Sequence, residues 1–174
     1  MRHFLSLVDL LTRAGAIMAA VIVAAMVGHI LLEIVLRAVF DSSTYVLDEF
    51  VGYGVAASTF LGLGYTLAQG GLIRVNILLA RIRSRAMRQL TEVTCVAACF
   101  GVFAMVWLYF WSSISRNWTR GAVSETVAQV PLWIPEGLLL LGLSIFLLQL
   151  VAYAIRIVSG EPMIGERGPV AAAE

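Results

Sequence analysis

Four apolar runs, each about as long as a bilayer is thick, limit the possible folds of this chain more than any other feature. They cover residues 14–36, 46–68, 91–111 and 133–155. A helix rises about 1.5 Å per residue, so roughly 20 residues cross the hydrocarbon core. Alternation of period two is absent, and each span has to satisfy its own backbone hydrogen bonds. The sequence therefore predicts an all-α integral membrane protein with four transmembrane helices in one domain, residues 1–158.

The composition agrees with the bilayer as the solvent. The chain is 60% hydrophobic and 13% charged, whereas a soluble domain carries about a quarter charged residues. A net charge of +1, with no basic surface interleaved with aromatic residues, gives no basis for binding nucleic acid.

The two ends of the chain differ from the spans. Residues 1–13 place Arg2, Ser6, Asp9 and Arg13 on one helical face. This pattern predicts an amphipathic helix in the headgroup region, or else an extension of the first span. Residues 159–174, rich in Gly, Pro, Ala and Glu, predict a flexible cytoplasmic tail.

The arginines predict the orientation. Five of the twelve lie between spans two and three, in the segment Gly70–Arg88, namely Arg74, Arg81, Arg83, Arg85 and Arg88. Short basic loops stay on the cytoplasmic side and can anchor on lipid phosphates. The opposite side keeps only Arg37, Arg116 and Arg120. Both termini are therefore predicted to be cytoplasmic. The outer connections are then Val39–Leu47 and the longer Ser112–Pro135.

Three ionisable side chains, His29, Glu33 and Arg37, repeat every four residues in span one. Such groups are costly when they face lipid, so the stripe is expected to face protein or water. Glu33 and Arg37 can form a structural ion pair at i, i+4. A proton or ion relay, and snorkelling without a special role, are the alternatives. Haem ligation is not expected, because His3 is the only other histidine.

Small residues form two further stripes. One is Ala16, Ala20, Ala24 and Gly28 in span one, and the other is Gly54, Ser58 and Gly62 in span two. Both predict close helix packing, with a partner as a candidate contact. Asp48 and Glu49 open span two, where they are expected to favour the helix start or to contact Arg37 or a partner.

The pattern does not assemble a catalytic site. It shows no nucleophile with a base, no phosphate loop and no metal cluster, so we expect no enzyme, no cofactor and no metal. Cys95 and Cys99 are interpreted as small packing residues. A broken span, which would indicate a transporter's own midplane site, is also absent. The architecture instead suggests a second membrane protein as partner.

Several short motifs, in order and spacing, carry a resemblance. They are Glu33-Ile-Val-Leu-Arg37, Asp48-Glu49-Phe50, the segment from Gly62 to Ile82, and Pro131-Leu-Trp-Ile-Pro135. On these, over about residues 14–158, the chain resembles the small membrane subunit (Q subunit, DctQ type) of tripartite ATP-independent periplasmic (TRAP) transporters. Leu72 and Asn76 stand where histidine and aspartate are common in that family.

The resemblance implies a non-catalytic permease subunit in the bacterial inner membrane, for sodium-driven uptake of organic acids. Its implied partners are a large membrane subunit (M subunit), which carries the substrate and moves as an elevator, and a periplasmic binding protein. The small subunit is then expected to be a scaffold, anchored in phospholipid, that helps dock the binding protein. Two alternatives stay open, a self-sufficient proton-coupled exporter using Glu33, and a membrane anchor of a redox enzyme.

Overall fold

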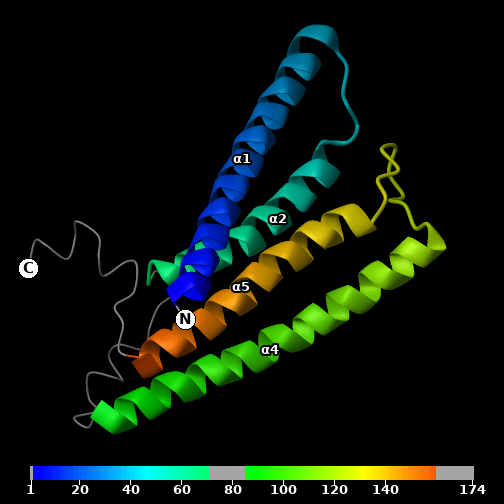
Figure 1. The fold of residues 1–174 in the computed structure, drawn as a ribbon. Coiled ribbons are helices and arrows are strands. Elements are labelled where there is room, and N and C mark those ends of the chain that lie inside the picture. The colour runs from blue at the N-terminus through cyan, green and yellow to red at the C-terminus, as the bar shows by residue number, and fades with distance from the viewer. Residues whose placement is uncertain (1, 71–84, 160–174) are drawn as a thin grey trace, which may run out of the picture.

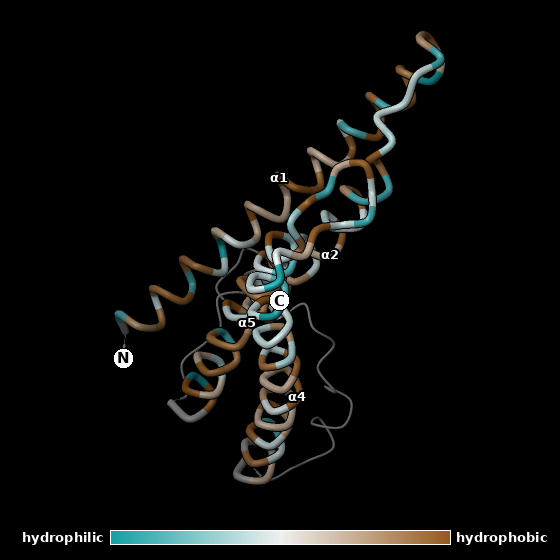
Figure 2. The backbone as a smooth tube through the Cα atoms, turned by 90° about the vertical axis from the view of Figure 1, so that its right-hand side faces the viewer, coloured by the Kyte–Doolittle hydropathy of each residue, from teal (hydrophilic) through white to brown (hydrophobic). Residues whose placement is uncertain are grey.

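The computed structural model describes residues 2–70 and 85–159 of the chain. This part folds into four helices, α1 (Arg2–Phe40), α2 (Leu47–Ala68), α4 (Arg85–Arg120) and α5 (Trp133–Ser159) (Figure 1). Each is long and apolar enough to cross a membrane. Figure 2 shows hydrophobic residues along all four helices and hydrophilic ones near their ends and connections. The predicted all-α protein with four membrane-spanning helices is confirmed.

α5 contacts each of the other three helices. α1 packs on α2 and α5, α2 packs on α5, and α4 packs on α5. The α1–α2 and α4–α5 connections lie at one end of the bundle, and the N-terminus lies at the other (Figure 1). A hydrogen bond from Thr126 Oγ1 to Glu49 joins the α4–α5 connection to the first turn of α2. The alternation agrees with four successive crossings, whereas the side of the membrane stays a prediction.

α1 is one unbroken helix, so residues 2–13 extend the first span and do not form a separate interfacial helix. No proline interrupts residues 2–40. The inner side of this extension is apolar, since Leu5 and Val8 are buried against Ala152 of α5. With 39 residues, α1 is about 58 Å long, roughly twice the hydrocarbon thickness. It therefore has to tilt or extend beyond the hydrocarbon core.

α4 also extends further than the apolar run predicts. It continues to Arg120, so the connection to α5 is residues 121–132 and not all of Ser112–Pro135. Thr119 near this end bonds back to its own helix, donating from Oγ1 to the Ser115 carbonyl. The polar residues from Ser112 to Arg120 therefore lie on the last turns of α4 and do not form a loop.

Three glycines bring α1, α2 and α5 close together around the fully buried Leu61. A Cβ on Gly142 would lie 2.6 Å from the Phe60 carbonyl carbon, and one on Gly15 would lie 3.0 Å from the Leu61 carbonyl oxygen. Gly64 faces Thr12 and Ile145 at 3.1 and 3.2 Å by the same measure. Backbone can approach backbone here because no side chain intervenes.

The small-residue stripes predicted in spans one and two contribute less to packing within the chain than these three glycines do. Gly54 is buried against Met26, but a Cβ on Gly62 would meet nothing within 4 Å. The Ser58 hydroxyl donates to the Val55 carbonyl of its own helix. On α1, the ridge residues Ala20, Ala24 and Gly28 are exposed. The α1 ridge is therefore free for a contact outside this chain.

The contact between α4 and α5 is aromatic. Phe103 packs edge-to-face on Phe146 with ring centroids 4.8 Å apart, and Trp107 Nε1 donates to Ser144 Oγ at 2.9 Å. Cys99 packs against this cluster as expected, whereas Cys95 is exposed on the outer side of α4 and is not a packing residue of the chain.

Candidate functional site

Glu33 organises the end of the bundle at which α1 meets α2. Its side chain is only 2% exposed and accepts four hydrogen bonds. Oε1 accepts from Arg37 Nε at 2.9 Å and from Ser43 Oγ. Oε2 accepts from the Thr44 amide at 3.0 Å and from Thr44 Oγ1 at 2.7 Å. The carboxylate thus ties the 41–46 connection to the last turns of α1.

The other two residues of the stripe, His29 and Arg37, differ in their surroundings. His29 Nε2 lies 3.5 Å from Thr44 Oγ1, and its ring packs edge-to-face on Phe50 at 6.0 Å. Arg37 is largely exposed although it bonds to Glu33. A carboxylate held by four donors is a fixed acceptor, and taking up a proton would cost it these bonds. The geometry therefore favours a structural pair over a proton relay.

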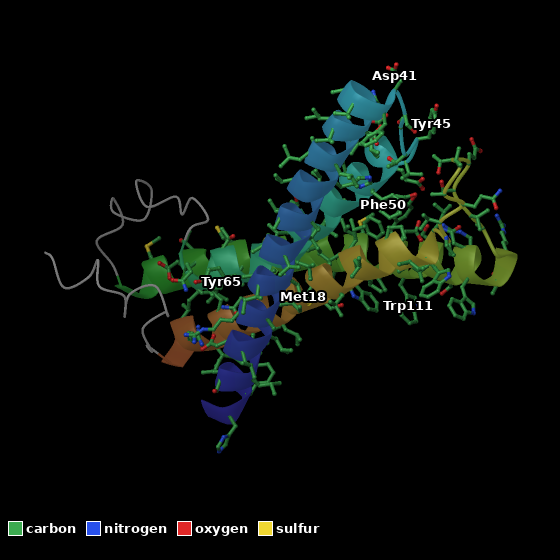
Figure 3. All side chains as sticks on the ribbon, turned by 90° about the horizontal axis from the view of Figure 1, so that it is seen from above. Met18, Asp41, Tyr45, Phe50, Tyr65 and Trp111 are labelled. Atoms are coloured by element: carbon green, nitrogen blue, oxygen red, sulfur yellow. The ribbon has the colours of Figure 1, made fainter. Side chains whose placement is uncertain are left out.

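The connection that Glu33 holds is conformationally costly. Asp41 and Tyr45 have φ angles of 46° and 58°, in the left-handed region, although neither is glycine. Such residues cost about 1 kcal/mol or more each and persist when the surroundings hold them. Figure 3 shows both at the tip beyond α1. The hydrogen bonds to Glu33 offset this cost.

We expect Glu33→Gln to lower the apparent melting temperature in detergent by several degrees. The amide presents an N–H₂ where two donors now point, so at least one donor loses its acceptor. Asp48→Asn is the matched control, because Asp48 is an exposed acid of the same end. Its melting temperature is expected to fall by only about a degree, through the lost charge in the first turn of α2, and equal losses in both variants would contradict this role of Glu33.

Glu49 connects the start of α2 to the 121–132 connection. Tyr53 Oη donates to its Oε1 at 2.8 Å, and Thr126 Oγ1 donates to its Oε2. The N-cap residue of α2 is Val46 and makes no side-chain capping bond. The expected contact of these acids with Arg37 is not found, since Arg37 bonds to Glu33 and Ser43 instead. Glu49 therefore joins α2 to a connection 77 positions away in the sequence, which spacing within span two could not reveal.

Glu136 is a third carboxylate of this end, and the sequence analysis missed it. It accepts from Ser113 Oγ at 3.0 Å and from Asn117 Nδ2 at 2.9 Å, so it joins the end of α4 to the first turn of α5. The 121–132 connection itself is closed by a bridge between Val123 and Pro131. The sequence did offer a signal for this contact. Glu136 opens a span, and Ser113 and Asn117, four residues apart, can present two donors on one face of the preceding helix.

The opposite end carries a buried ion pair. Arg156 Nη2 lies 2.7 Å from both carboxylate oxygens of Asp9. Arg156 is 6% exposed and Asp9 is 22% exposed. The pair joins the start of α1 to the last turns of α5, residues 147 positions apart. The sequence analysis did not single out Arg156, because its partner lies far away along the chain.

Several residues that the sequence analysis named lie outside the described part of the chain, as does most of the predicted tail. They are Arg74, Arg81, Arg83, Leu72 and Asn76. Arg85 and Arg88 lie in the first turn of α4. In the part of the chain that is described, no group of three His, Cys, Asp or Glu side chains could hold a metal ion.

Comparison with known proteins identifies the family. The family model described as tripartite ATP-independent periplasmic transporters, DctQ component, matches residues 26–160. The match contains the Glu33 and Glu49 networks and the glycine contacts of α2 with α5. Comparison with curated proteins and with solved structures gave no match.

Proposed function

We propose that this chain, which belongs to the DctQ family of tripartite ATP-independent periplasmic transporters, is the fixed support of such a transporter. As a small permease subunit it works with a large membrane subunit and a periplasmic binding protein. Substrate and sodium sites then belong to the large subunit, and sodium-driven uptake of an organic acid is the activity of the complex. The function is thus to brace and to dock, without a catalytic step.

The state of the buried charges supports this proposal most. Among the described residues, the buried charged side chains are Glu33 and Arg156. Both are held by partners within the chain, Glu33 by four donors and Arg156 by Asp9. A transporter's own site keeps charged groups available to its substrate or coupling ion. The exporter that would use Glu33 is correspondingly less well supported.

The lengths and angles of the helices suit a brace. α1 and α4, with 39 and 36 residues, each exceed the hydrocarbon thickness. Seen from above, α1 crosses the direction of α4 and α5 at a wide angle (Figure 3). Trp111 and Trp118 are exposed on α4 at the end where aromatic anchors are expected. Long helices that lie at different tilts resist being carried along by a moving neighbour.

The surface formed by the two connections suits docking of the binding protein. Glu49 bonds to the 121–132 connection, Glu136 joins the two helix ends that flank it, and Glu33 holds the 41–46 connection. Tyr45 and Val127 project from this surface and are largely exposed. The excess of arginine in the other connection predicts that this surface is periplasmic. A soluble partner would therefore find a preorganised surface with apolar projections.

A substitution on the α1 ridge tests the proposal. We expect Gly28→Leu to reduce the amount of large subunit that co-purifies with this chain about tenfold, since ridge contacts depend on close backbone approach. Gly101→Leu on α4 is the control, because both glycines are exposed with nothing within 4 Å of a Cβ. Uptake by reconstituted complex is the second measurement. If the purified chain alone transports an organic acid into proteoliposomes, the proposal fails.

A further inference from the structure

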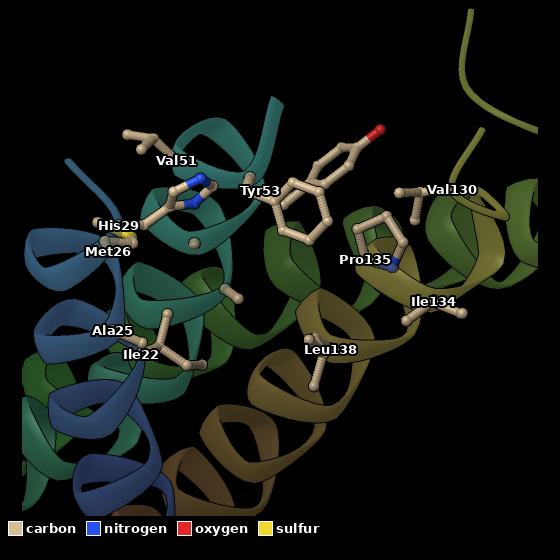
Figure 4. Close-up of a pocket in the computed structure, with 13 residues that line it drawn as sticks. Ile22, Ala25, Met26, His29, Val51, Tyr53, Val130, Ile134, Pro135 and Leu138 are labelled. Carbon is tan, nitrogen blue, oxygen red and sulfur yellow. The ribbon is translucent and has the colours of Figure 1, made fainter. Parts of the chain in front are cut away.

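An apolar cleft of about 280 Å³ lies between α1, α2 and the start of α5 (Figure 4). Its walls include Ile22 and His29 of α1, Phe50 of α2, and Pro135 and Leu138 of α5. The lining helices are long and apolar enough to span a membrane, and the cleft lies toward their connection end, at the first turns of α2 and α5. Nearly all the lining is hydrocarbon. An occupant therefore has to be apolar along most of its length.

The cleft, with about 280 Å³ of space, admits a slender apolar occupant. A single hydrocarbon chain is narrow and flexible, and can follow the walls. An acyl chain of a membrane lipid meets both requirements.

A cation lies on the same face of α1 as the cleft. Ile22, Met26 and His29 line the cleft, and Arg37 follows on this face two turns beyond His29, about 12 Å along the axis. The side chain of Arg37 is 64% exposed. Ser43 and Thr44 also donate to Glu33, so this carboxylate does not depend on Arg37 alone. Arginine offers five donors and suits phosphate.

We propose that the cleft holds one acyl chain of a phospholipid whose phosphate is bound by Arg37. Arg37 matches the phosphate of such a molecule, and the apolar cleft matches its acyl chain. The site uses residues of this chain only, and it goes beyond the proposed function as a transporter support. The lipid fills the space where α1 and α2 diverge from α5, and so stabilises the packing at the connection end.

Photolabelling in vesicles tests the site. The full-length chain is reconstituted in vesicles of phosphatidylethanolamine and phosphatidylglycerol that contain a trace of phosphatidylcholine with a diazirine in one acyl chain. A diacylglycerol with the same labelled chain is the second probe, since it lacks the phosphate. After irradiation, mass spectrometry maps the labelled peptides. We expect the phospholipid to label peptides containing residues 22–29 and 50–57 more strongly than the diacylglycerol does.

Two kinds of variant separate the tail site from the headgroup site. Ala25→Phe fills the cleft and is expected to abolish its labelling, whereas Ala24→Phe, one residue away and not in the lining, leaves labelling intact. Leu138→Phe fills the cleft from α5 and repeats the test. Arg37→Gln is expected to reduce phospholipid labelling about tenfold, the loss of one charged hydrogen bond, without changing diacylglycerol labelling. Equal labelling of the Ala24 and Ala25 variants, or by the two probes, would overturn the proposal.

Discussion

Replacing Arg156 by methionine is expected to lower the free energy of unfolding by about 3 kcal/mol, because it leaves Asp9 without the Nη2 group that donates to both of its oxygens. Arg156 is 6% exposed, so water cannot replace the lost contact fully from its side. Asp9 is 22% exposed, which keeps the expected loss at the lower end of the range for buried pairs. Thermal unfolding in detergent, followed by circular dichroism, measures the change.

The double variant Asp9→Leu with Arg156→Met separates the pair from the cost of an unpaired charge. Removing both charges together is expected to bring stability back to within about 1 kcal/mol of the parent chain. Arg116→Met serves as a control at an exposed arginine whose side chain, among the described residues, bonds to Ser112 of its own helix. Its effect is expected to stay below about 0.5 kcal/mol. An Arg156 variant as stable as the Arg116 variant would refute the prediction.

The second large effect is expected at Gly142, where Gly142→Ala should destabilise the chain by about 3 kcal/mol. The added Cβ would lie 2.6 Å from the Phe60 carbonyl carbon and 2.7 Å from the Leu61 amide nitrogen. Both atoms are backbone, so no rotamer change relieves the clash and α2 has to move away from α5. Because the same contact holds α1 through Gly15, loosening is expected to spread to three helices.

Gly137→Ala provides the control within the same helix. A Cβ at Gly137 meets nothing within 4 Å, and alanine favours a helix over glycine by up to about 1 kcal/mol. The two substitutions are therefore expected to shift the midpoint of unfolding in opposite directions. Two shifts of the same sign would mean that the α2–α5 contact is not set by the absence of a side chain at Gly142.

The positions of the helices could be predicted because hydropathy and length decide membrane insertion locally. The apolar run 46–68 corresponds closely to α2, which covers Leu47–Ala68. The ends of α1 and α4 were less predictable, since polar helix that extends past the hydrocarbon leaves no hydropathy signal. The charged pattern of residues 2–13 suggested a lipid interface, but Leu5 and Val8 instead pack on Ala152.

The residues of the site divide in the same way. The pair of Glu33 with Arg37 follows from helical spacing, because residues four apart share a face. The bonds of Glu33 to Thr44 and of Glu49 to Thr126 depend on how the connections fold back. Likewise, repeated small residues show that a helix can come close, but not which helix does. Gly142 and Gly15 make tight contacts with backbone and Gly54 packs on the Met26 side chain, whereas a Cβ on Gly62 would meet nothing within 4 Å.

The sequence by itself determined that this protein is a four-helix membrane protein of the small TRAP permease type, because apolar runs and short motifs are local properties of the chain. Only the tertiary structure decided which charges are neutralised and which glycines allow contact. The bond between Asp9 and Arg156 spans 147 positions, and no local pattern encodes the distance between helices. Helix packing sets that distance. It therefore decides that the buried side chains Glu33 and Arg156 bond within the chain and hold its helices and connections together.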